Sequence, residues 1–162
     1  MSNTIIGNDK IQKMFSIFHD GIMTNIKIDR ATLSFDVKIS YLAQRVNTEF
    51  QKFYVSLTGC KNLRFTTWPV IDGTEAQEIL DPVEIFRPEL DILSGELKSG
   101  QVQVTCNQPS PKFSYCGGEL YFSADFMIVL DEAGKNYTLE ELCELSRGYW
   151  EDWSKKTGSG KA

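Results

Sequence analysis

The stretch FHDGIMTNIKIDRATLSFDVKIS, residues 18–40, decides the fold class of this chain. Apolar residues occupy every second position in two runs, which are separated by Asp29, Arg30 and Ala31. Such alternation is typical of β-strands with one apolar and one polar face. Two runs joined by a short turn predict an antiparallel hairpin. The residues expected on its apolar face are Ile22, Thr24, Ile26, Ile28, Leu33, Phe35, Val37 and Ile39.

The residues before this hairpin follow a helical period instead. Four apolar residues recur at intervals of three and four, which predicts a helix with one apolar face. Asn8 or Asp9 can cap its start. The apolar face consists of Ile11, Met14, Phe15 and Phe18.

The only histidine of the chain, His19, lies between the predicted helix and the predicted hairpin. Gly21 can adopt the positive φ that often ends a helix, and Asp followed by Gly favours a turn. His19 could instead act as a general base oriented by Asp20, but adjacent side chains diverge along the backbone. We therefore expect a structural signature, with a hydrolytic enzyme that uses His19 as a less favoured alternative. The signature residues are Phe18, His19, Asp20 and Gly21.

Further alternating segments bring the expected number of strands to about seven. They lie at residues 52–60, 62–70, 89–98, 101–107 and 118–131. Their short links indicate antiparallel pairing, because parallel strands need long crossovers. The sequence therefore predicts an α+β fold built on an antiparallel sheet. The side chains expected on its polar, solvent-facing side are Lys27, Asp36, Lys38, Lys52 and Arg64.

The C-terminal region predicts a second helix. Thr138 and Glu141 have the spacing of a capping box, and Tyr137 with Leu142 matches a hydrophobic staple. We expect this helix to cover one face of the sheet within a single domain of residues 1–156, followed by a disordered tail at 157–162. The face expected to be buried consists of Leu142, Leu145, Tyr149 and Trp153.

The negative charge of the chain is concentrated in one segment. Residues 72–91 contain seven acidic residues and one basic residue, Arg87, whereas the whole chain has a net charge of −5. Such a segment repels nucleic-acid phosphates and attracts a basic protein. Its apolar residues could anchor a partner, or they could dock on the protein's own sheet. The residues expected to bind a partner are Asp72, Glu75, Glu78, Asp81, Glu84, Ile85 and Phe86.

Several function classes lack their sequence signals. The motifs GxxxxGK[ST], GxGxxG and GxSxG are absent, and one histidine with four cysteines and no CxxC pair does not complete a zinc site, so no cofactor or metal is expected. The cysteines are expected to be buried structural thiols. With no apolar run of about 18 residues and no secretory leader, we expect a cytoplasmic protein that binds neither membrane nor nucleic acid.

A small-molecule site is the main alternative to a protein-binding site. A sheet covered by the C-terminal helix could enclose an apolar ligand, which is a frequent use of such layered folds. An ordinary filled core at the same place would exclude it.

Two motifs carry a resemblance to a known group of proteins. The run FHDGI at residues 18–22, together with the segment GELYFSADF at 118–126 and a Trp-rich terminal helix, resembles immunity proteins of bacterial polymorphic toxin systems. The resemblance implies a cytoplasmic, non-enzymatic protein that neutralises a toxin by binding it. It implies no catalytic residue, and Phe18, His19 and Asp20 would be the shared structural signature. The acidic segment would suit a basic toxin domain of the nuclease type.

Overall fold

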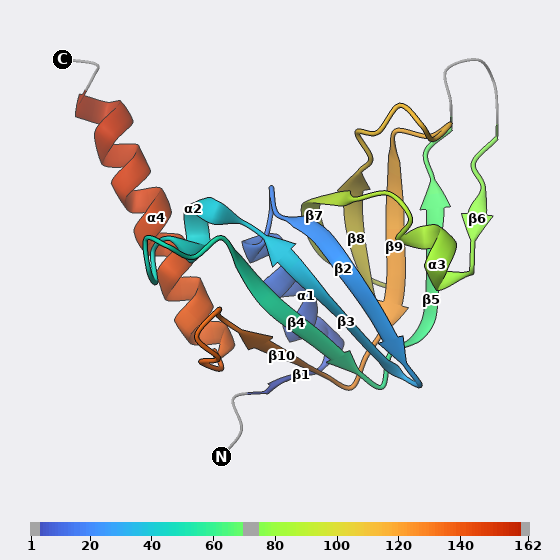
Figure 1. Cartoon of the computed structure of the whole chain (residues 1–162), viewed down its shortest axis with the longest axis horizontal. Coiled ribbons are helices and arrows are strands. Elements are labelled where there is room, and N and C mark those ends of the chain that lie inside the picture. Colours follow the sequence, from blue (N-terminus) through green and yellow to red (C-terminus); the bar gives the residue numbers. More distant parts are fainter. Residues whose placement is uncertain (1–3, 70–74, 160–162) are drawn as a thin grey trace.

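Figure 1 shows the computed structural model of the chain, which describes residues 4–69 and 75–159. The predicted α+β class is confirmed, with a short N-terminal helix, an antiparallel sheet and a C-terminal helix. The elements in chain order are β1 (Ile5–Ile6), α1 (Asn8–Ile17), β2 (Ile22–Asp29), β3 (Thr32–Lys38), α2 (Ser40–Ala43), β4 (Lys52–Thr58), β5 (Lys61–Thr67), β6 (Glu78–Ile79), α3 (Pro82–Ile85), β7 (Leu90–Lys98), β8 (Gln101–Asn107), β9 (Gly117–Ser123), β10 (Phe126–Leu130) and α4 (Leu139–Ser159).

The sheet within the described residues has ten strands, so the expected number of about seven is wrong. Strands β1 and β6 contain two residues each, which is too short for an alternating pattern to show. The run expected to form one strand over 118–131 is divided at Ala124 and Asp125 into β9 and β10. These two strands lie in different parts of the sheet, because the chain crosses over between them.

The sheet consists of two half-sheets that diverge from one narrow junction. Its strand order is β1-β10-β4-β3-β2-β7-β8-β9-β5-β6. The junction between β2 and β7 contains only two residue pairs, Ile22 with Asp91 and Met23 with Leu90. Beyond this junction the first half-sheet separates from the second (Figure 1). The first consists of β1, β10, β4, β3 and β2, and the second of β7, β8, β9, β5 and β6. A gap therefore opens in the middle of the sheet.

Two short links connect the half-sheets again away from this junction. The link from β4 to β5 passes through Gly59 and Cys60, and Cys60 N donates to Ala31 O at 2.8 Å. The link from β9 to β10 contains Asp125, whose backbone N donates to Thr58 O at 2.9 Å. Because each link is so short, the ends of the two half-sheets are held close together here.

Helix α1 forms the centre of the core. Its predicted apolar face is confirmed, since Ile11, Met14, Phe15 and Phe18 are all fully buried. The ring of Phe15 lies 6.2 Å from that of Phe35 in β3 and 5.7 Å from that of Phe122 in β9. One residue of α1 thus contacts both half-sheets.

A glycine in β7 allows α1 to approach the sheet closely. A Cβ atom on Gly95 would lie 2.7 Å from Cβ of Phe15 and would also collide with Gln12 O. The hydroxyl of Ser16 donates to Gly95 O at 2.8 Å. Only glycine fits at this contact without moving the helix.

The predicted apolar face of β2 is wrong for most of its length. Met23 is buried, whereas Ile28 is 46% exposed. The register of β2 against β3 shifts between Thr24 and Lys27, and Asn25 has a φ of 59°. This β-bulge inserts an extra residue, so Ile28, opposite Leu33, lies on the same face as Met23, opposite Val37, and the predicted residues Ile22 and Ile28 lie on opposite faces.

One side chain expected in solvent is buried. Asp36 is 7% exposed, and its Oδ2 accepts hydrogen bonds from Lys52 Nζ and from Asn25 Nδ2, each at 3.1 Å. The hydrogen bond with Asp36 raises the pKa of Lys52. A buried carboxylate needs such partners, and the bulged Asn25 supplies one of them.

Helix α4 begins as predicted, but it does not pack on the sheet as expected. The capping box is confirmed: Glu141 N donates to Thr138 Oγ1 at 3.1 Å, and Thr138 N donates to Glu141 Oε1 at 2.9 Å. The helix packs against α1 and α2 and extends away from the sheet (Figure 1), because α1 already fills the apolar face. Leu142 is buried, but Trp153 is 50% exposed, so the expected burial of the whole face is wrong.

The predicted end of this helix also needs correction. The helix continues to Ser159, so residues 157–159 are helical rather than a disordered tail. Each residue added to an existing helix closes one more backbone hydrogen bond, which favours such an extension. The last three residues, 160–162, lie outside the described part of the chain.

Candidate functional site

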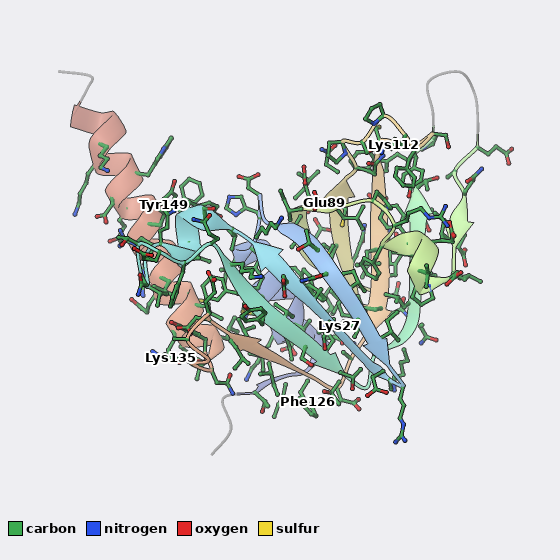
Figure 2. The ribbon with its side chains drawn as sticks, in the orientation of Figure 1. Lys27, Glu89, Lys112, Phe126, Lys135 and Tyr149 are labelled. Carbon is green, nitrogen blue, oxygen red and sulfur yellow. The ribbon has the colours of Figure 1, made fainter. Side chains whose placement is uncertain are left out.

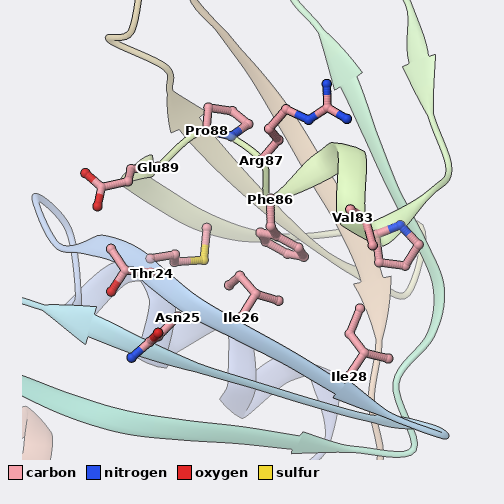
Figure 3. Close-up of a pocket in the computed structure, with 11 residues that line it drawn as sticks. Thr24, Asn25, Ile26, Ile28, Val83, Phe86, Arg87, Pro88 and Glu89 are labelled. Atoms are coloured by element: carbon pink, nitrogen blue, oxygen red, sulfur yellow. The ribbon is translucent and has the colours of Figure 1, made fainter.

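The acidic segment forms one wall of a cleft between the two half-sheets. From β6, at one end of the sheet, the chain passes through α3 and reaches β7 beside β2. Residues 82–89 of this segment face residues 23–28 of β2 across a cleft of about 570 Å³ (Figure 3). The cleft therefore lies where the β2–β7 ladder stops.

Local interactions explain why the chain turns at α3. Asp81 is the N-cap residue, and its Oδ1 accepts a hydrogen bond from Val83 N at 3.0 Å. Pro82 occupies the first helical position, where its missing N–H costs nothing. Arg87 forms an ion pair with Glu84 one turn earlier. Asp81 and Glu84 thus have structural roles in addition to their charge.

The seven residues predicted to bind a partner are not brought together at one place. Phe86 lines the cleft, while Ile85 is fully buried in the core and is not accessible to a partner. Exposed Glu75 and Glu78 lie outside the cleft, before and in β6. Asp72 lies outside the described residues. The buried side chain of Ile85 anchors the single turn of α3 to the core.

The structure adds apolar residues to the site that were not predicted there. Val83 is 69% exposed and Ile28 is 46% exposed, and both line the cleft with Ile26 and Phe86 (Figure 3). Val83 and Phe86 are three residues apart and share the side of the helical turn that faces the cleft, whereas Ile85 is buried in the core. Ile28 lies opposite buried Leu33 on the same face of the sheet, so its exposure comes from the open cleft beside β2, which alternation alone does not show.

Charged residues surround these apolar side chains. Glu89 and Arg87 line the cleft, and exposed Asp81 lies next to it at the start of α3. On the β2 side the nearby basic residue is Lys27; Figure 2 labels it together with Glu89 on the opposite half-sheet. Among residues 75–91, six acidic residues accompany the single Arg87. Six acidic residues minus one arginine give this segment a net charge of −5, of which only Glu84, Glu89 and Arg87 belong to the cleft wall at residues 82–89.

The edge of β2 along the cleft is open. The pairing of β2 with β7 ends at Met23, whereas the pairing with β3 continues on the other edge as far as Asp29. Within the described residues, no strand is paired with residues 24–29 of β2 on the cleft side. Backbone N–H and C=O groups on that edge can therefore pair with another chain.

His19 belongs to an aromatic cluster rather than to this cleft. Its ring stacks on Trp150 of α4, with the ring centres 5.3 Å apart, and its Nδ1 lies 3.2 Å from Ser16 O. The backbone carbonyl of His19 accepts a hydrogen bond from the hydroxyl of Tyr41 at 2.8 Å. Burial, together with the charge of Asp20, raises the pKa of Tyr41. These contacts connect the end of α1 with α2 and α4.

The signature residues form the expected turn with one difference. Asp20, not Gly21, has the positive φ, at 70°. Gly21 is required for space instead: a Cβ there would lie 2.6 Å from Cγ1 of Val37 and 2.8 Å from Phe18 O. Asp tolerates the left-handed region better than most residues, which explains why it can take this place.

The expectation that all four cysteines are buried is wrong. Cys106 is buried and Cys60 is half-buried, but Cys116 and Cys143 are exposed. All four are free thiols. Burial raises the pKa of Cys60 to about 11, so this thiol is not ionised near neutral pH.

The sheet and the C-terminal helix do not enclose a site between them, because the helix does not cover the sheet. The apolar face of the sheet is covered by α1, whose buried side chains fill the core, while α4 contacts α1 and α2. A hollow of about 690 Å³ does lie beside α4, between this helix and α2, with Tyr41, Arg45 and Tyr149 among its lining residues. The described residues contain no group of three or more His, Cys, Asp or Glu side chains placed to hold a metal ion.

Comparison with known proteins adds no family assignment. The chain matches no protein family, no curated protein and no solved structure with which it was compared. In the described part of the chain, no helix combines the length and apolar character needed to cross a membrane.

Proposed function

We propose that this protein is a non-catalytic binding protein that captures a basic partner protein at the cleft between β2 and α3. The observation that carries the proposal is the combination of exposed Val83 and Ile28 with the acidic segment at residues 75–91, part of which forms one wall of the cleft. Apolar anchors surrounded by charge are typical of protein-binding sites.

The charge distribution supports a basic partner. Carboxylates attract a basic surface over roughly a Debye length, about 8 Å at physiological salt, and so raise the association rate. Glu75, Glu78 and Glu89 are exposed and can act in this way, Glu89 from the cleft itself and the two others from outside it. The apolar residues would then slow dissociation once contact is made.

We further propose that the protein acts as an immunity-type inhibitor in the cytoplasm, where it neutralises a toxin by binding a basic domain. The FHDGI resemblance supports this role. His19 packs in an aromatic cluster, where the turn that contains it joins α1, α2 and α4. This packing offers a structural explanation for the motif. Neither the sequence motif nor its contacts require a catalytic step.

A photo-crosslinking experiment tests the proposal while the identity of the partner is still open. The photoreactive amino acid p-benzoylphenylalanine replaces Val83, and in a control variant it replaces Leu97, which is 48% exposed but does not line the cleft. Adducts formed in the cells that produce the protein are identified by mass spectrometry. We expect a basic protein to be captured at position 83 and not at position 97. The same adducts at both positions would contradict the proposal.

A small-molecule-binding protein is the second candidate. Its support is the cleft volume of about 570 Å³, which falls within the usual range of roughly 300–1,000 Å³ for ligand pockets. Native mass spectrometry of the protein purified from its own cells distinguishes the two functions. A bound compound that is lost in the Val83→Lys variant and kept in Leu97→Lys would favour this candidate.

A further inference from the structure

We propose that the partner inserts an extended basic segment into the cleft, where the segment pairs with the open edge of β2 as an additional strand. This inference rests on the proposed function and specifies how the partner is held. It goes beyond charge attraction, because it assigns the main recognition to backbone groups of residues 24–29.

The first support is the unusual position of this strand edge. Most exposed edges lie at the ends of a sheet, but β2 is an inner strand whose neighbour β7 leaves it after two residue pairs. Asn25, Lys27, Ile28 and Asp29 are exposed and Ile26 is half-buried, so α1 and α3 do not cover the edge. An extended peptide can satisfy such an edge by continuing the hydrogen-bonded ladder.

The second support is the composition of the opposite wall. Side chains of an extended strand alternate between two directions, so a bound segment presents different residues to different surfaces. Apolar side chains of the segment would contact Ile28, Val83 and Phe86, which point into the cleft (Figure 3). Its other side chains would reach the rim, where Glu89 and neighbouring Asp81 outnumber Arg87 and favour lysine or arginine.

The third support is a set of features in β2 that restrict which chains can pair with this edge. Proteins commonly protect exposed edges with bulges, basic residues or short strands. The bulge at Asn25 and Lys27 at the middle of β2 are such features. They discourage pairing with a second copy of this edge, since two copies would bring their Lys27 residues together, while the acidic segment at residues 75–91 still attracts a different, basic chain. The occupant is therefore a segment of another protein.

The test uses a blocked nine-residue peptide of alternating lysine and valine as the probe. Two further versions carry N-methyl groups on the backbone, one at every lysine and the other at every valine, and a fourth peptide has glutamate in place of lysine. N-methylation removes N–H donors while charge and side chains remain. Binding to the full-length protein is measured at low salt, and amide hydrogen exchange is followed residue by residue.

Strand addition predicts three results. The unmodified basic peptide binds and the acidic one does not. The two N-methylated versions differ from each other by about tenfold or more, since losing two backbone hydrogen bonds of roughly 1 kcal/mol each is sufficient for that factor. Exchange slows for amides within residues 24–29, and Val83→Lys weakens binding whereas Leu97→Lys does not.

Other results overturn the inference. Equal binding of both N-methylated peptides, or binding without slower exchange in β2, would mean that charge alone captures the peptide; the proposed function would then stand without strand addition. Failure of the basic peptide to bind also overturns the inference. In that case specific crosslinking at position 83 separately decides whether a protein binds at the cleft.

Discussion

Helices α1 and α3 both lie near the gap in the sheet, but they bury their apolar residues to different extents. The face of α1 formed by Ile11, Met14 and Phe15 is fully buried between the half-sheets. Helix α3 buries Ile85 and leaves Val83 69% exposed opposite an open strand edge. The hydrophobic effect explains the first arrangement completely, because burial of these side chains stabilises the fold. Exposed apolar residues beside an unpaired edge contribute little to stability, and their clustering instead favours binding.

The largest expected effect tests the buried side of this comparison. Phe15→Ala should lower the free energy of unfolding by about 3–5 kcal/mol, because it leaves a cavity between both half-sheets. The matched change Val83→Ala should alter it by less than about 0.5 kcal/mol. Chemical denaturation measures both. Similar losses in the two variants would show that α3 is as important for folding as α1.

The contact between α1 and β7 gives the next effect. Gly95→Ala adds a methyl group that meets the backbone of α1 at Gln12 and the side chain of Phe15. We expect a loss of about 1–3 kcal/mol, which is typical of overpacking. A variant as stable as the wild type would mean that α1 can move away from the sheet at no cost.

Helix α4 provides a test of intermediate size at its start. Thr138→Ala removes the acceptor of the hydrogen bond from Glu141 N and should cost about 1 kcal/mol. Denaturation with the single substitution measures this loss. No change would show that α4 is held only by its contacts with α1 and α2.

The same capping box makes stability depend on pH. The hydrogen bond from Thr138 N, with a smaller effect of Lys135, lowers the pKa of Glu141. Stabilisation from this carboxylate is therefore present above the ordinary glutamate pKa and is lost as pH falls through the lowered value. The stability difference between wild type and Glu141→Gln should disappear in acid. A difference that is unchanged at low pH would contradict this assignment. Because Glu141 is partly exposed, the effect is small.

The smallest stability effect is expected near the other end of α4. Trp153 is 50% exposed, so Trp153→Ala should change the free energy of unfolding by no more than about 0.5 kcal/mol. A loss of several kcal/mol would mean that α4 is packed more closely against the body of the protein in solution. Differential scanning calorimetry of the variant measures the change.

Several features of the fold could be predicted because their causes are local. The spacing of Ile11, Met14 and Phe15 indicates α1, and the reciprocal capping residues Thr138 and Glu141 mark the start of α4. Alternation also identifies β3, β4 and β8, whose inner residues are buried as expected. Each of these signals depends on neighbours within a few residues.

Features that depend on distant parts of the chain could not be predicted in this way. An apolar stripe on α4 does not show that α1 already covers the sheet. A single bulge at Asn25 reverses the faces of β2, and the early end of its ladder with β7 has no periodic signal. The acidic segment was visible in the sequence, but the cleft beside it was not, since β2 and α3 are separated by more than fifty residues.

Association kinetics test most directly the central claim that the acidic segment at residues 75–91 guides a basic partner into the cleft. The partner captured at position 83 is mixed with the wild type and with a triple variant, Glu75→Gln, Glu78→Gln and Glu89→Gln, at low and at high salt. At low salt we expect the variant to associate more slowly, on the order of tenfold, with nearly equal rates at high salt and unchanged folding. Equal association rates at low salt would contradict the claim.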